Sequence, residues 1–588
     1  MNSDIIISTY GNNKNGMGHV KRCIWLAKLF KKDFGVSVYL LVNKNEQMED
    51  LIKREKIPFT ALLNDADEER FLLENPCKVL IVDKRDTNQA IYRQLNSITI
   101  ALDNFGPDKD YFDYLINPLP YFKDSMSNFQ GERFLLFPEE IWNYQKPKIL
   151  RPIRKILVTF GGSDPRDLSY IIKEVFERIK ETFEIAIILG PLYEGRLKGQ
   201  ELIPEHIKII EPQQNLHRYM QAFDLVITSF GITAFEAAII GTPSFILNPS
   251  DYHEKITRAS GLFSAGVGSI KKIEKIKDRL EAFIREPQFP VLDLPSKGNI
   301  QFKMILKKIL QRPKRKCAIC GQSDSLVVGR DGYFNHYFCE KDKVFFRDKN
   351  YVAAVSYSSN YFLDDYKKQY GKTYEEDRPN IDKLNNQRLK IIRRLLPVAH
   401  RKRNLLEVGS ALGFFLKMAQ DKGDFAVEGA EISSYAAGYA REKLRLDVKT
   451  QNFLKMDIGH PCYDVLAMWY YIEHNERIED VLSQIKRALK IGGLLALSTP
   501  NAHGVSSRKN RKKYAAKIPA DHYYEFSPVG ITRLMEQNGF KLRFVRTTGN
   551  HPKRWIKLPF RFLDSLLVLI MRKKKLGDTF EAYFERIS

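Results

Sequence analysis

The first half of the chain alternates short apolar runs with segments whose apolar residues have helical spacing. Ile5, Ile6 and Ile7 form a run of strand character, and residues 20–30 then place Cys23, Leu26, Ala27 and Phe30 on one helical face. Strands alternating with helices give parallel sheets, whose functional sites lie at the carboxyl ends of the strands. We therefore predict two Rossmann-like units, residues 1–148 and 149–311, with a cleft between them. The other predicted elements here are strands at 36–42, 79–83, 97–102, 155–160, 224–228 and 244–247, and helices at 46–55, 168–180 and 234–240.

The same alternation returns after residue 400. Apolar strand-like runs cover residues 404–409, 426–431, 463–468 and 494–499, and a helical segment covers residues 414–421. The overall expectation is an α/β fold class, with a third Rossmann-like domain over residues 351–555.

A short basic stretch, residues 311–316, separates the halves. Pro313 cannot continue the helix predicted before it, and the Lys and Arg side chains are too polar to bury. We interpret the stretch as a solvated linker rather than a nucleic-acid patch. With the cysteines that follow, it forms a predicted small module, residues 312–350.

Length and composition agree with several globular domains. A chain of 588 residues is too long for one core, and 44% hydrophobic and 12% aromatic residues exclude disorder. The net charge of +23 raises the question of nucleic acid, but the Lys and Arg residues are spread along the whole chain. Anionic substrates or an anionic membrane surface explain the charge equally well, and we expect no nucleic-acid partner.

Three of the six cysteines form a candidate zinc site. Cys317 and Cys320 have knuckle spacing, Cys339 follows, and Asp342 stands at the fourth position, with His336 as a further candidate ligand. A closed structural zinc site normally prefers thiolate or imidazole over carboxylate. A degenerate ribbon without metal therefore remains the alternative.

The two ends of the sequence bear on location. The first residues lack the basic and apolar regions of a signal peptide, so we expect a cytoplasmic enzyme. Residues 556–588 begin as a basic amphipathic tail, too polar to span a bilayer. The tail is expected either to contact the inner face of the cell membrane or to pack on the preceding domain.

A glycine- and asparagine-rich loop, residues 11–18, leads into the first predicted helix. This strand, loop and helix order lets backbone N–H groups face an anion. His19 stands where the loop enters the helix. It is either a capping or packing residue or a general base, because imidazole titrates near neutrality.

These motifs carry a family resemblance. The segment from Gly16 to Cys23 reads Gly-Met-Gly-His-Val-Lys-Arg-Cys and resembles the signature of the UDP-sugar hydrolase of pseudaminic acid biosynthesis. That enzyme removes UDP from a 2,4-diacetamido-2,4,6-trideoxy-altrose and has a glycosyltransferase-B-like fold. The segments at 160–165, 101–104 and 233–236, together with Asp83, follow in the family's order.

The resemblance implies roles for these residues. His19 would activate water for attack at the anomeric carbon, with no metal required, and Glu236 would accept hydrogen bonds from the uridine ribose. The remaining nucleotide-sugar residues that it implies are Gly16, Gly18, Asp83, Gly161, Gly162, Ser229, Gly231, Thr233 and His253. The chain departs from the family pattern at Ile232 and at Tyr252-His253, which leaves the exact sugar open.

In the second half, residues 404–413 run from a predicted strand through Gly409, Ala411 and Gly413 toward a helix. This segment resembles motif I of class I S-adenosylmethionine-dependent methyltransferases of sugar and glycan clusters, with Ala411 in place of the middle glycine. The resemblance extends through the Glu473-His474 segment to Pro500-Asn501 and includes the cysteine module and the His522 motif. It implies that the cofactor is bound by Glu407, Gly409, Gly413, Glu431 at the ribose, Asn452 at the adenine, and Met468.

Methyl transfer is mostly positioning of the acceptor, and an oxygen or nitrogen acceptor must also lose a proton. His474 and His522 are the candidate bases, although a structural role at a helix start is favoured for His474. The sequence thus predicts a bifunctional enzyme of surface-glycan biosynthesis, acting on a UDP-sugar and on a sugar or glycan methyl acceptor. The alternatives for the first half are a glycosyltransferase and a non-catalytic sugar-nucleotide-binding module.

Overall fold

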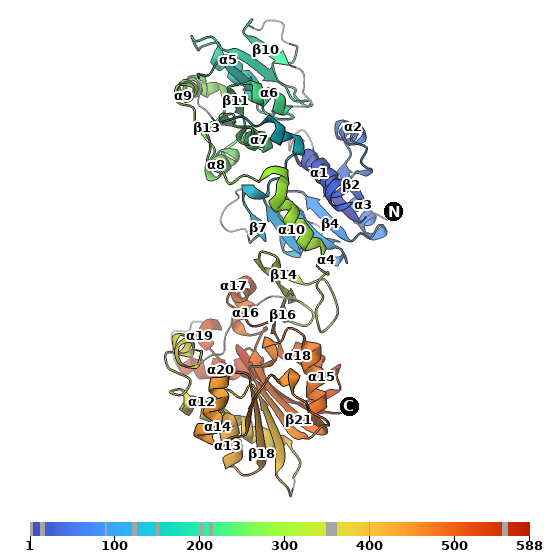
Figure 1. The fold of residues 1–588 in the computed structure, drawn as a ribbon, viewed down its shortest axis with the longest axis vertical. Coiled ribbons are helices and arrows are strands. Elements are labelled where there is room, and N and C mark those ends of the chain that lie inside the picture. Colours follow the sequence, from blue (N-terminus) through green and yellow to red (C-terminus); the bar gives the residue numbers. More distant parts are fainter. Residues whose placement is uncertain are drawn as a thin grey trace. The chain divides into compact units, whose positions relative to one another are not determined.

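The computed structural model describes residues 4–11, 18–88, 91–119, 126–148, 152–199, 204–210, 216–348, 361–398, 400–555 and 562–588. The chain forms two compact units (Figure 1). The first unit comprises Met1–Lys314 and Arg330–Tyr333, and the second comprises Arg315–Gly329 and Phe334–Ser588. The three large sheets are parallel or largely parallel, so the predicted α/β fold class with Rossmann-like sheets is confirmed.

The first sheet of the first unit is parallel, with the order β3-β2-β1-β4-β5-β6-β7. Apolar side chains of β1 pack against α1, as the helical spacing predicts. The strands are β1 (Ile5–Thr9), β2 (Val38–Asn43), β3 (Phe59–Leu62), β4 (Val79–Asp83), β5 (Ile98–Leu102), β6 (Tyr114–Asn117) and β7 (Phe129–Gln130), and the helices are α1 (Gly18–Leu29), α2 (Glu46–Arg54), α3 (Asp65–Glu74) and α4 (Ile91–Gln94).

The second sheet of this unit is also parallel, with the order β10-β9-β8-β11-β12-β13. Its strands are β8 (Lys155–Val158), β9 (Glu184–Ile188), β10 (Ile207–Ile210), β11 (Leu225–Thr228), β12 (Ser244–Asn248) and β13 (Ser264–Val267). Its helices are α5 (Leu168–Phe176), α6 (Leu216–Ala222), α7 (Ile232–Ile240), α8 (Asp251–Ala259) and α9 (Ile273–Arg285).

The last helix before the linker differs from expectation. The domain prediction places residues 300–310 with the second Rossmann-like half, but α10 (Ile300–Leu310) buries Phe302, Ile305, Leu306 and Ile309 in the core of the first sheet. The chain therefore returns to the first half before the linker. The apolar stripe of α10 predicts a buried face but not which sheet covers it.

The main sheet of the second unit has the order β19-β18-β17-β20-β21-β24-β23. Its first five strands are parallel, and β24 is antiparallel to both of its neighbours. The strands are β17 (Arg403–Val408), β18 (Phe425–Glu431), β19 (Val448–Thr450), β20 (Tyr463–Trp469), β21 (Leu489–Pro500), β23 (Phe540–Thr548) and β24 (Thr579–Arg586).

Two helical layers cover this sheet (Figure 1). Successive strand residues point to opposite faces. Leu405, Val465 and Ala467 therefore pack with α12 (Arg378–Leu395), α13 (Phe414–Asp421) and α14 (Ser434–Leu444). Leu406, Leu466 and Met468 pack with α15 (Ile478–Ala488) and α18 (Pro528–Glu536) on the other face.

The predicted tail from residue 556 requires correction. Residues 579–586 are not a surface tail but the strand β24, which lies between β21 and β23. Phe580, Ala582 and Phe584 are fully buried. The strand is buried at every position from Phe580 to Phe584, so it lacks the alternation of a half-exposed strand, and Glu581 interrupts its apolar run.

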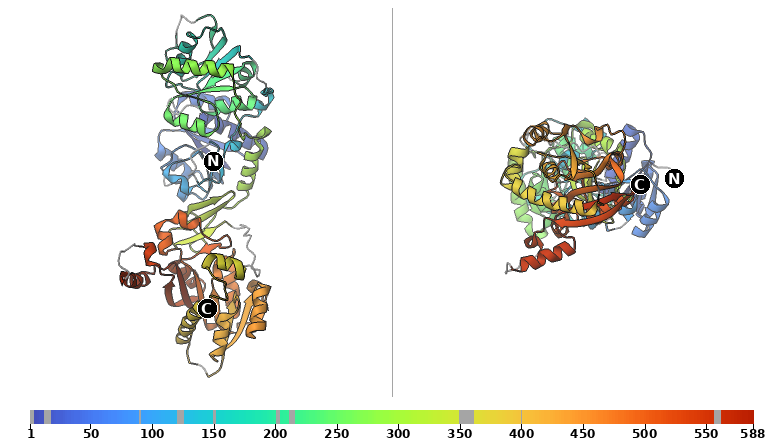
Figure 2. Two further views of the ribbon diagram at one scale, coloured as in Figure 1. Left: turned by 90° about the vertical axis from the view of Figure 1, so that its left-hand side faces the viewer. Right: turned by 90° about the horizontal axis from the view of Figure 1, so that it is seen from below.

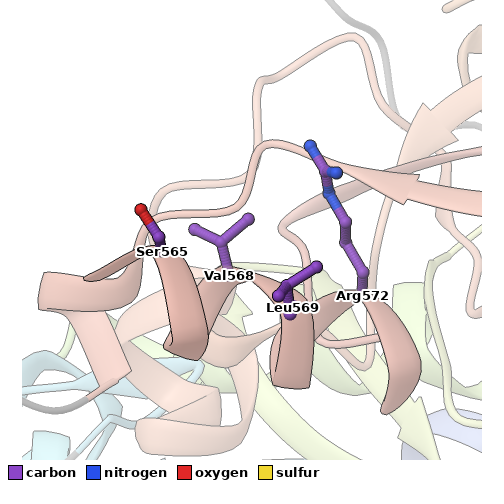
Figure 3. A pocket seen from close by; sticks show the side chains of 4 residues that line it. All are labelled: Ser565, Val568, Leu569 and Arg572. Carbon is purple, nitrogen blue, oxygen red and sulfur yellow. The ribbon is translucent and has the colours of Figure 1, made fainter. Parts of the chain in front are cut away.

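Helix α20 (Phe562–Lys573) precedes that strand and lies at the margin of the second unit (Figure 2). Leu566 and Leu569 are exposed, and a shallow, open pocket lined by Ser565, Val568, Leu569 and Arg572 runs along the helix (Figure 3). No helix among the described residues is long and apolar enough to cross a membrane.

The cysteine module shares the core of the second unit. The strands β14 (Leu326–Asp331), β15 (Phe334–Cys339), β16 (Val344–Arg347) and β22 (Tyr524–Glu525) form a four-stranded sheet. Cys317 and Cys339 pack in one cluster with Ile531 and Leu534 of α18. The module predicted as residues 312–350 is therefore joined to the predicted methyltransferase domain and is not a separate body.

Candidate active sites

The first site is built around His19, in the first turn of α1. Its Nδ1 lies 2.7 Å from Oδ1 of Asp83, the last residue of β4. Arg22, one turn further along α1, donates two hydrogen bonds to Asp83, at 2.7 Å and 2.5 Å, and one to Asp103. The helix and the strand end thus place a histidine, an arginine and two acids in one network.

Charge balance explains this network. The side chains of Arg22, Asp83 and Asp103 are almost fully buried. Burial alone would raise the pKa of Asp83, but the charges of Arg22 and His19 hold it well below its usual range. Burial raises the pKa of Asp103 despite the opposing charge of Arg22. Asp83 is therefore the ionised partner that orients the His19 ring.

The predicted phosphate loops lie at strand ends in the second sheet. Gly161, which follows β8, adopts φ +80°, a conformation that favours glycine. Gly231 caps α7, with Ser229 just before it and Thr233 in its first turn, all three partly exposed. A β-carbon at Gly18 would lie 3.9 Å from Ile232 Cδ1. The start of α1 therefore lies close to the start of α7.

Gly190 is a supporting residue that the sequence does not single out. A β-carbon there would lie only 2.2 Å from the carbonyl oxygen of Gly161 and 2.4 Å from that of Gly162. Only glycine lets the chain after β9 approach this loop so closely. A lone glycine in a loop gives no pattern that could have revealed this role.

Glu236 lies in α7 and is buried. Its Oε1 is 3.1 Å from Nε2 of His217, a residue of α6 that the sequence analysis missed. A single histidine on a short helix carries no motif, so the pair emerges only in three dimensions.

His253 lies near the start of α8, where Oγ of Ser250 is 2.7 Å from its Nδ1. The neighbouring Tyr252 ring has the Arg85 guanidinium 4.2 Å from its centroid. Burial lowers the pKa of His253, and the charge of Arg85 lowers it further. Arg85 follows β4 in the first sheet, so the segment that departs from the family pattern contacts the other Rossmann-like half. Gly16 lies outside the described residues.

The predicted cofactor loop joins β17 to α13. Gly409, Ala411 and Gly413 all have positive φ, at 70°, 47° and 82°. Gly413 is favoured by its backbone conformation and by space, because a β-carbon there would meet Leu446 Cδ1 at 2.7 Å and Ala440 Cβ at 3.1 Å. Glu431, the last residue of β18, accepts hydrogen bonds from the N–H groups of Ala411 and Ser433, each at 2.8 Å. Glu431 therefore holds the loop in place.

Glu407 is buried at the end of β17. Its Oε2 accepts no hydrogen bond from any described residue. Burial raises the pKa of Glu407 well above its usual range, while the charge of Arg388 opposes the shift. This carboxylate oxygen can therefore accept a hydrogen bond from a bound ligand.

The two other predicted cofactor residues lie near these strand ends. Asn452 is exposed and caps a short helix by accepting from the Leu454 N–H at 2.8 Å. Met468 is fully buried at the end of β20.

His474 and His522, distant in sequence, lie side by side. Their ring centroids are 4.6 Å apart in an edge-to-face arrangement. Nδ1 of His474 is 3.0 Å from Asp521, and Nδ1 of His522 is 2.7 Å from Glu525. Burial raises the pKa of the neighbouring Glu473 to about 7, although the charge of His474 opposes it. The sequence named the two histidines but missed the acids that orient them, because acids near a histidine are common in any sequence.

The candidate zinc ligands also come together. Cys320 Sγ and Cys339 Sγ are 3.8 Å apart, and Asp342 Oδ2 lies 3.4 Å from Cys317 Sγ. Arg533 donates to the other carboxylate oxygen of Asp342 at 2.5 Å. His336 is not part of this group of four in the described chain.

Comparison with known proteins assigns part of the second unit. Residues 380–544 match a family model described as a methyltransferase domain. Together with the sheet order and the antiparallel β24, the match gives the second unit a class I methyltransferase fold.

Two curated proteins are similar to the chain. An uncharacterised protein of Methanocaldococcus jannaschii is 29% identical over 289 residues, covering 43% of this chain and 59% of that protein. The chain thus spans less than two thirds of that relative. A spore coat polysaccharide biosynthesis protein of Bacillus subtilis is 22% identical over 266 residues, covering 41% of this chain and 76% of that protein.

Solved structures also resemble part of the chain. A possible histamine N-methyltransferase of Thermotoga maritima is 18% identical with a TM-score of 0.28, covering 37% of this chain and 97% of that one. Geranyl diphosphate C-methyltransferase of Streptomyces coelicolor is 15% identical with a TM-score of 0.27, covering 34% of this chain and 75% of that one.

Proposed function

We propose that this chain is a bifunctional enzyme of bacterial surface-glycan biosynthesis, of the nonulosonic acid type. Its first unit hydrolyses a UDP-deoxyaminosugar and releases UDP, and its second unit transfers a methyl group from S-adenosylmethionine to a sugar or glycan. The match of residues 380–544 to a methyltransferase domain carries the second activity. The network of His19, Asp83 and Arg22 carries the first.

The described residues fit S-adenosylmethionine. Gly409 and Gly413 have no side chains and positive φ, so a ligand can approach the backbone at the end of β17, where a methyltransferase domain holds its cofactor. The unpartnered Glu407 oxygen suits a ligand that carries an amino group. When bound, the cofactor supplies the methyl group; the residues of this chain hold it and orient the acceptor.

An acceptor hydroxyl must lose a proton as it is methylated. Asp521 and Glu525 each hold one ring nitrogen of a histidine, which directs the opposite nitrogen of that ring as the proton acceptor. His522 is the better base candidate, because its acid partner Glu525 is itself fixed by the Tyr514 hydroxyl at 2.6 Å.

Hydrolysis in the first unit follows from the orientation of His19. With Asp83 accepting from Nδ1–H, the other ring nitrogen takes the proton of a water that attacks the anomeric carbon. The bond from that carbon to the UDP oxygen breaks. The N-terminus of α7 suits the diphosphate, and Glu236 suits the ribose hydroxyls.

The glycan context rests on a relative. The Bacillus subtilis protein is named for spore coat polysaccharide biosynthesis. A sugar or glycan acceptor for the methyl group agrees with that name and with a sugar-nucleotide site on the same chain.

A structural zinc ion in the cysteine module is part of the proposal. Zinc–thiolate bonds of about 2.3 Å place the corners of a tetrahedron about 3.8 Å apart. The Cys320–Cys339 separation of 3.8 Å and the Cys317–Asp342 separation of 3.4 Å fit this arrangement. The ion would join the ribbon to α18 through Asp342 and Arg533.

The decisive experiment for the first unit measures UDP release by the full chain from the UDP-linked diacetamido-trideoxy-altrose. The wild-type chain should release UDP without any acceptor, and His19→Ala should slow release by about 100-fold or more. His206→Ala changes a histidine outside the site and serves as the matched control. Release that requires an added glycan would instead make this unit a glycosyltransferase, and no release under either condition would make it a binding module.

A further inference from the structure

Three side chains of the second unit converge beside the predicted cofactor loop. Ligand atoms of Glu473, His474 and His522 all lie within 4.8 Å of one another. Glu473 and His474 belong to the turn after β20, and His522 lies just before β22. A backbone hydrogen bond of 2.8 Å from Tyr523 N–H to the Glu473 carbonyl holds the two segments together.

The surroundings of the two histidines are those of metal ligands. Asp521 contacts one ring at 3.0 Å and Glu525 contacts the other at 2.7 Å, both at Nδ1. Carboxylates in this position orient a ring so that Nε2 becomes the ligand atom, and they raise its basicity. Tyr514 and the β16–β22 pairing in turn fix Glu525.

Glu473 is the unusual member of this group. It is completely buried, yet neither of its carboxylate oxygens accepts a hydrogen bond from a residue that the structure describes. A buried carboxylate without a partner is costly, and burial is normally compensated by a cation or by hydrogen bonds. No Lys or Arg of the described chain forms an ion pair with Glu473, and a bound cation would supply the missing partner.

The position of the group connects it to methyl transfer. Tyr471, two residues before Glu473, lies 3.2 Å from a β-carbon placed on Gly409. The three side chains therefore lie next to the loop on which the cofactor is expected to bind.

We propose that Glu473, His474 and His522 bind a divalent transition-metal ion. Two imidazoles and one carboxylate on one side of an ion leave its other positions open to a substrate. Ligand atoms at about 2.1 Å from a metal are about 3–3.5 Å apart, so metal binding requires the three side chains to close by about 1 Å.

The role of this ion rests on the proposed methyl transfer. The open positions take the oxygen of a hydroxyl-bearing acceptor, and coordination lowers the pKa of that hydroxyl. With Nε2 of each histidine bound to the ion, neither ring can accept the proton, so the ion takes over the activating role assigned above to His522. The hydroxyl loses its proton to solvent, the oxygen bonds to the methyl carbon, and the carbon–sulfur bond of the sulfonium breaks. The site thus favours an acceptor with an oxygen able to coordinate a metal, such as a sugar hydroxyl or carboxylate.

Cobalt(II) titration of the metal-stripped full chain tests the site. Thiolate ligation gives cobalt an intense sulfur charge-transfer band, which imidazole and carboxylate ligands lack, so the absorption spectrum separates this site from the cysteine module. The wild-type chain should show a component without sulfur ligation, of one ion per chain. Glu473→Gln and His522→Gln should each weaken that component by 10-fold or more.

Two variants make the result specific. Cys320→Ser changes the cysteine module and should leave the sulfur-free component of the spectrum intact. His503→Ala changes a histidine outside the group of three and should also leave that component intact. Asp521→Asn should weaken binding by about 10- to 100-fold without removing a ligand. Unchanged binding of S-adenosylmethionine by each variant shows that the domain is still folded.

Several outcomes would overturn the inference. The first is a wild-type chain that shows no cobalt component free of sulfur ligation. The second is full retention of that component in both Glu473→Gln and His522→Gln. The third is loss of that component in His503→Ala. A chain that transfers methyl groups but binds no such ion would refute the metal site and leave the proposed methyltransferase function standing. A chain that binds the ion but never methylates an acceptor would support the metal site and refute the proposed methyltransferase function.

Discussion

Asp83 and Asp103 show how two similar residues in one network differ in function. Both accept hydrogen bonds from Arg22, but only Asp83 touches His19. Asp83 can therefore orient the base His19, whereas Asp103 only balances the charge of Arg22. Substituting each aspartate in turn tells these two roles apart.

We expect Asp83→Asn to lower the rate of UDP release by about 100-fold or more, because an amide no longer fixes the ring of His19 in the required tautomer. Asp103→Asn removes a carboxylate from the same arginine and should cost far less activity. Steady-state assays of the full chain give both values. Equal losses in the two variants would mean that Asp83 acts only by pairing with Arg22.

Glu407 yields a prediction about pH. Burial raises its pKa well above the usual range, so between about pH 4 and the folded-state pKa the folded chain binds more protons than the unfolded chain. Its contribution to the free energy of unfolding therefore falls as pH rises. Glu407→Gln should remove this decline and raise the melting temperature near neutral pH.

The same substitution should weaken S-adenosylmethionine binding by about 10-fold, since a charged hydrogen bond is lost. Melting curves at several pH values measure the first effect, and the transition that shifts on adding cofactor identifies the second unit. Glu442→Gln, an exposed change on α14, is the control. If Glu407→Gln does not raise the melting temperature, ionisation of the buried Glu407 carboxyl group does not destabilise the folded chain, and the prediction is wrong.

At the scale of elements, a buried ion-pair network ties β24 into the main sheet of the second unit. Glu581 contacts Arg388 of α12 at 2.9 Å and Arg546 of β23 at 2.6 Å, and its side chain is 1% exposed. One carboxylate on the strand thus connects a helix and a neighbouring strand.

Removing this charge should be costly. Glu581→Gln leaves two arginines without their buried partner, and we expect a loss of about 3–5 kcal/mol in the free energy of unfolding of the second unit. Glu585 lies four residues further along the same strand and contacts the partly exposed Arg543. Glu585→Gln should change stability by less than about 1 kcal/mol. Urea unfolding compares the two, and similar losses would contradict the assigned role of Glu581.

The elements that the sequence predicted are those whose pattern is local. The runs at 79–83, 404–409 and 463–468 are strands, and their alternation with helices correctly predicted parallel sheets. β24 was missed because its central glutamate is neutralised by arginines about 35 and 190 residues away, which a local pattern does not reveal.

The sites divide in the same way. Motifs located His19, His474, His522 and the four candidate zinc ligands, because the spacing of these residues is characteristic. Asp521, the partner of His474, and His217, the partner of Glu236, belong to no motif and become evident only when separate segments meet. Glu525 lies within the His522 motif, but its contact with the ring appears only in the structure. The roles of all these residues remain predictions.

At the scale of the whole molecule, each site uses side chains of one unit. His19, Asp83 and Glu236 belong to the first, whereas Glu407, Glu431 and His522 belong to the second. The two proposed activities should therefore be separable within the intact chain.

We expect His19→Ala to leave the affinity for S-adenosylmethionine unchanged within about twofold, and Glu431→Ala to leave UDP release equally unchanged. Calorimetric binding and UDP assays on the full chain measure the two quantities. A change of about fivefold or more in either direction would reveal energetic coupling between the sites.

The assignment of Arg330–Tyr333 to the first unit limits how this protein can be recombined. These four residues interrupt the second unit, and Arg330 donates to the carbonyl groups of Lys109, Phe112 and Asp113 and to the Asn128 side chain. A gene fusion made at the linker would leave those acceptors behind without their arginine. Exchange of either half for that of another protein would therefore have to keep or replace these four hydrogen bonds.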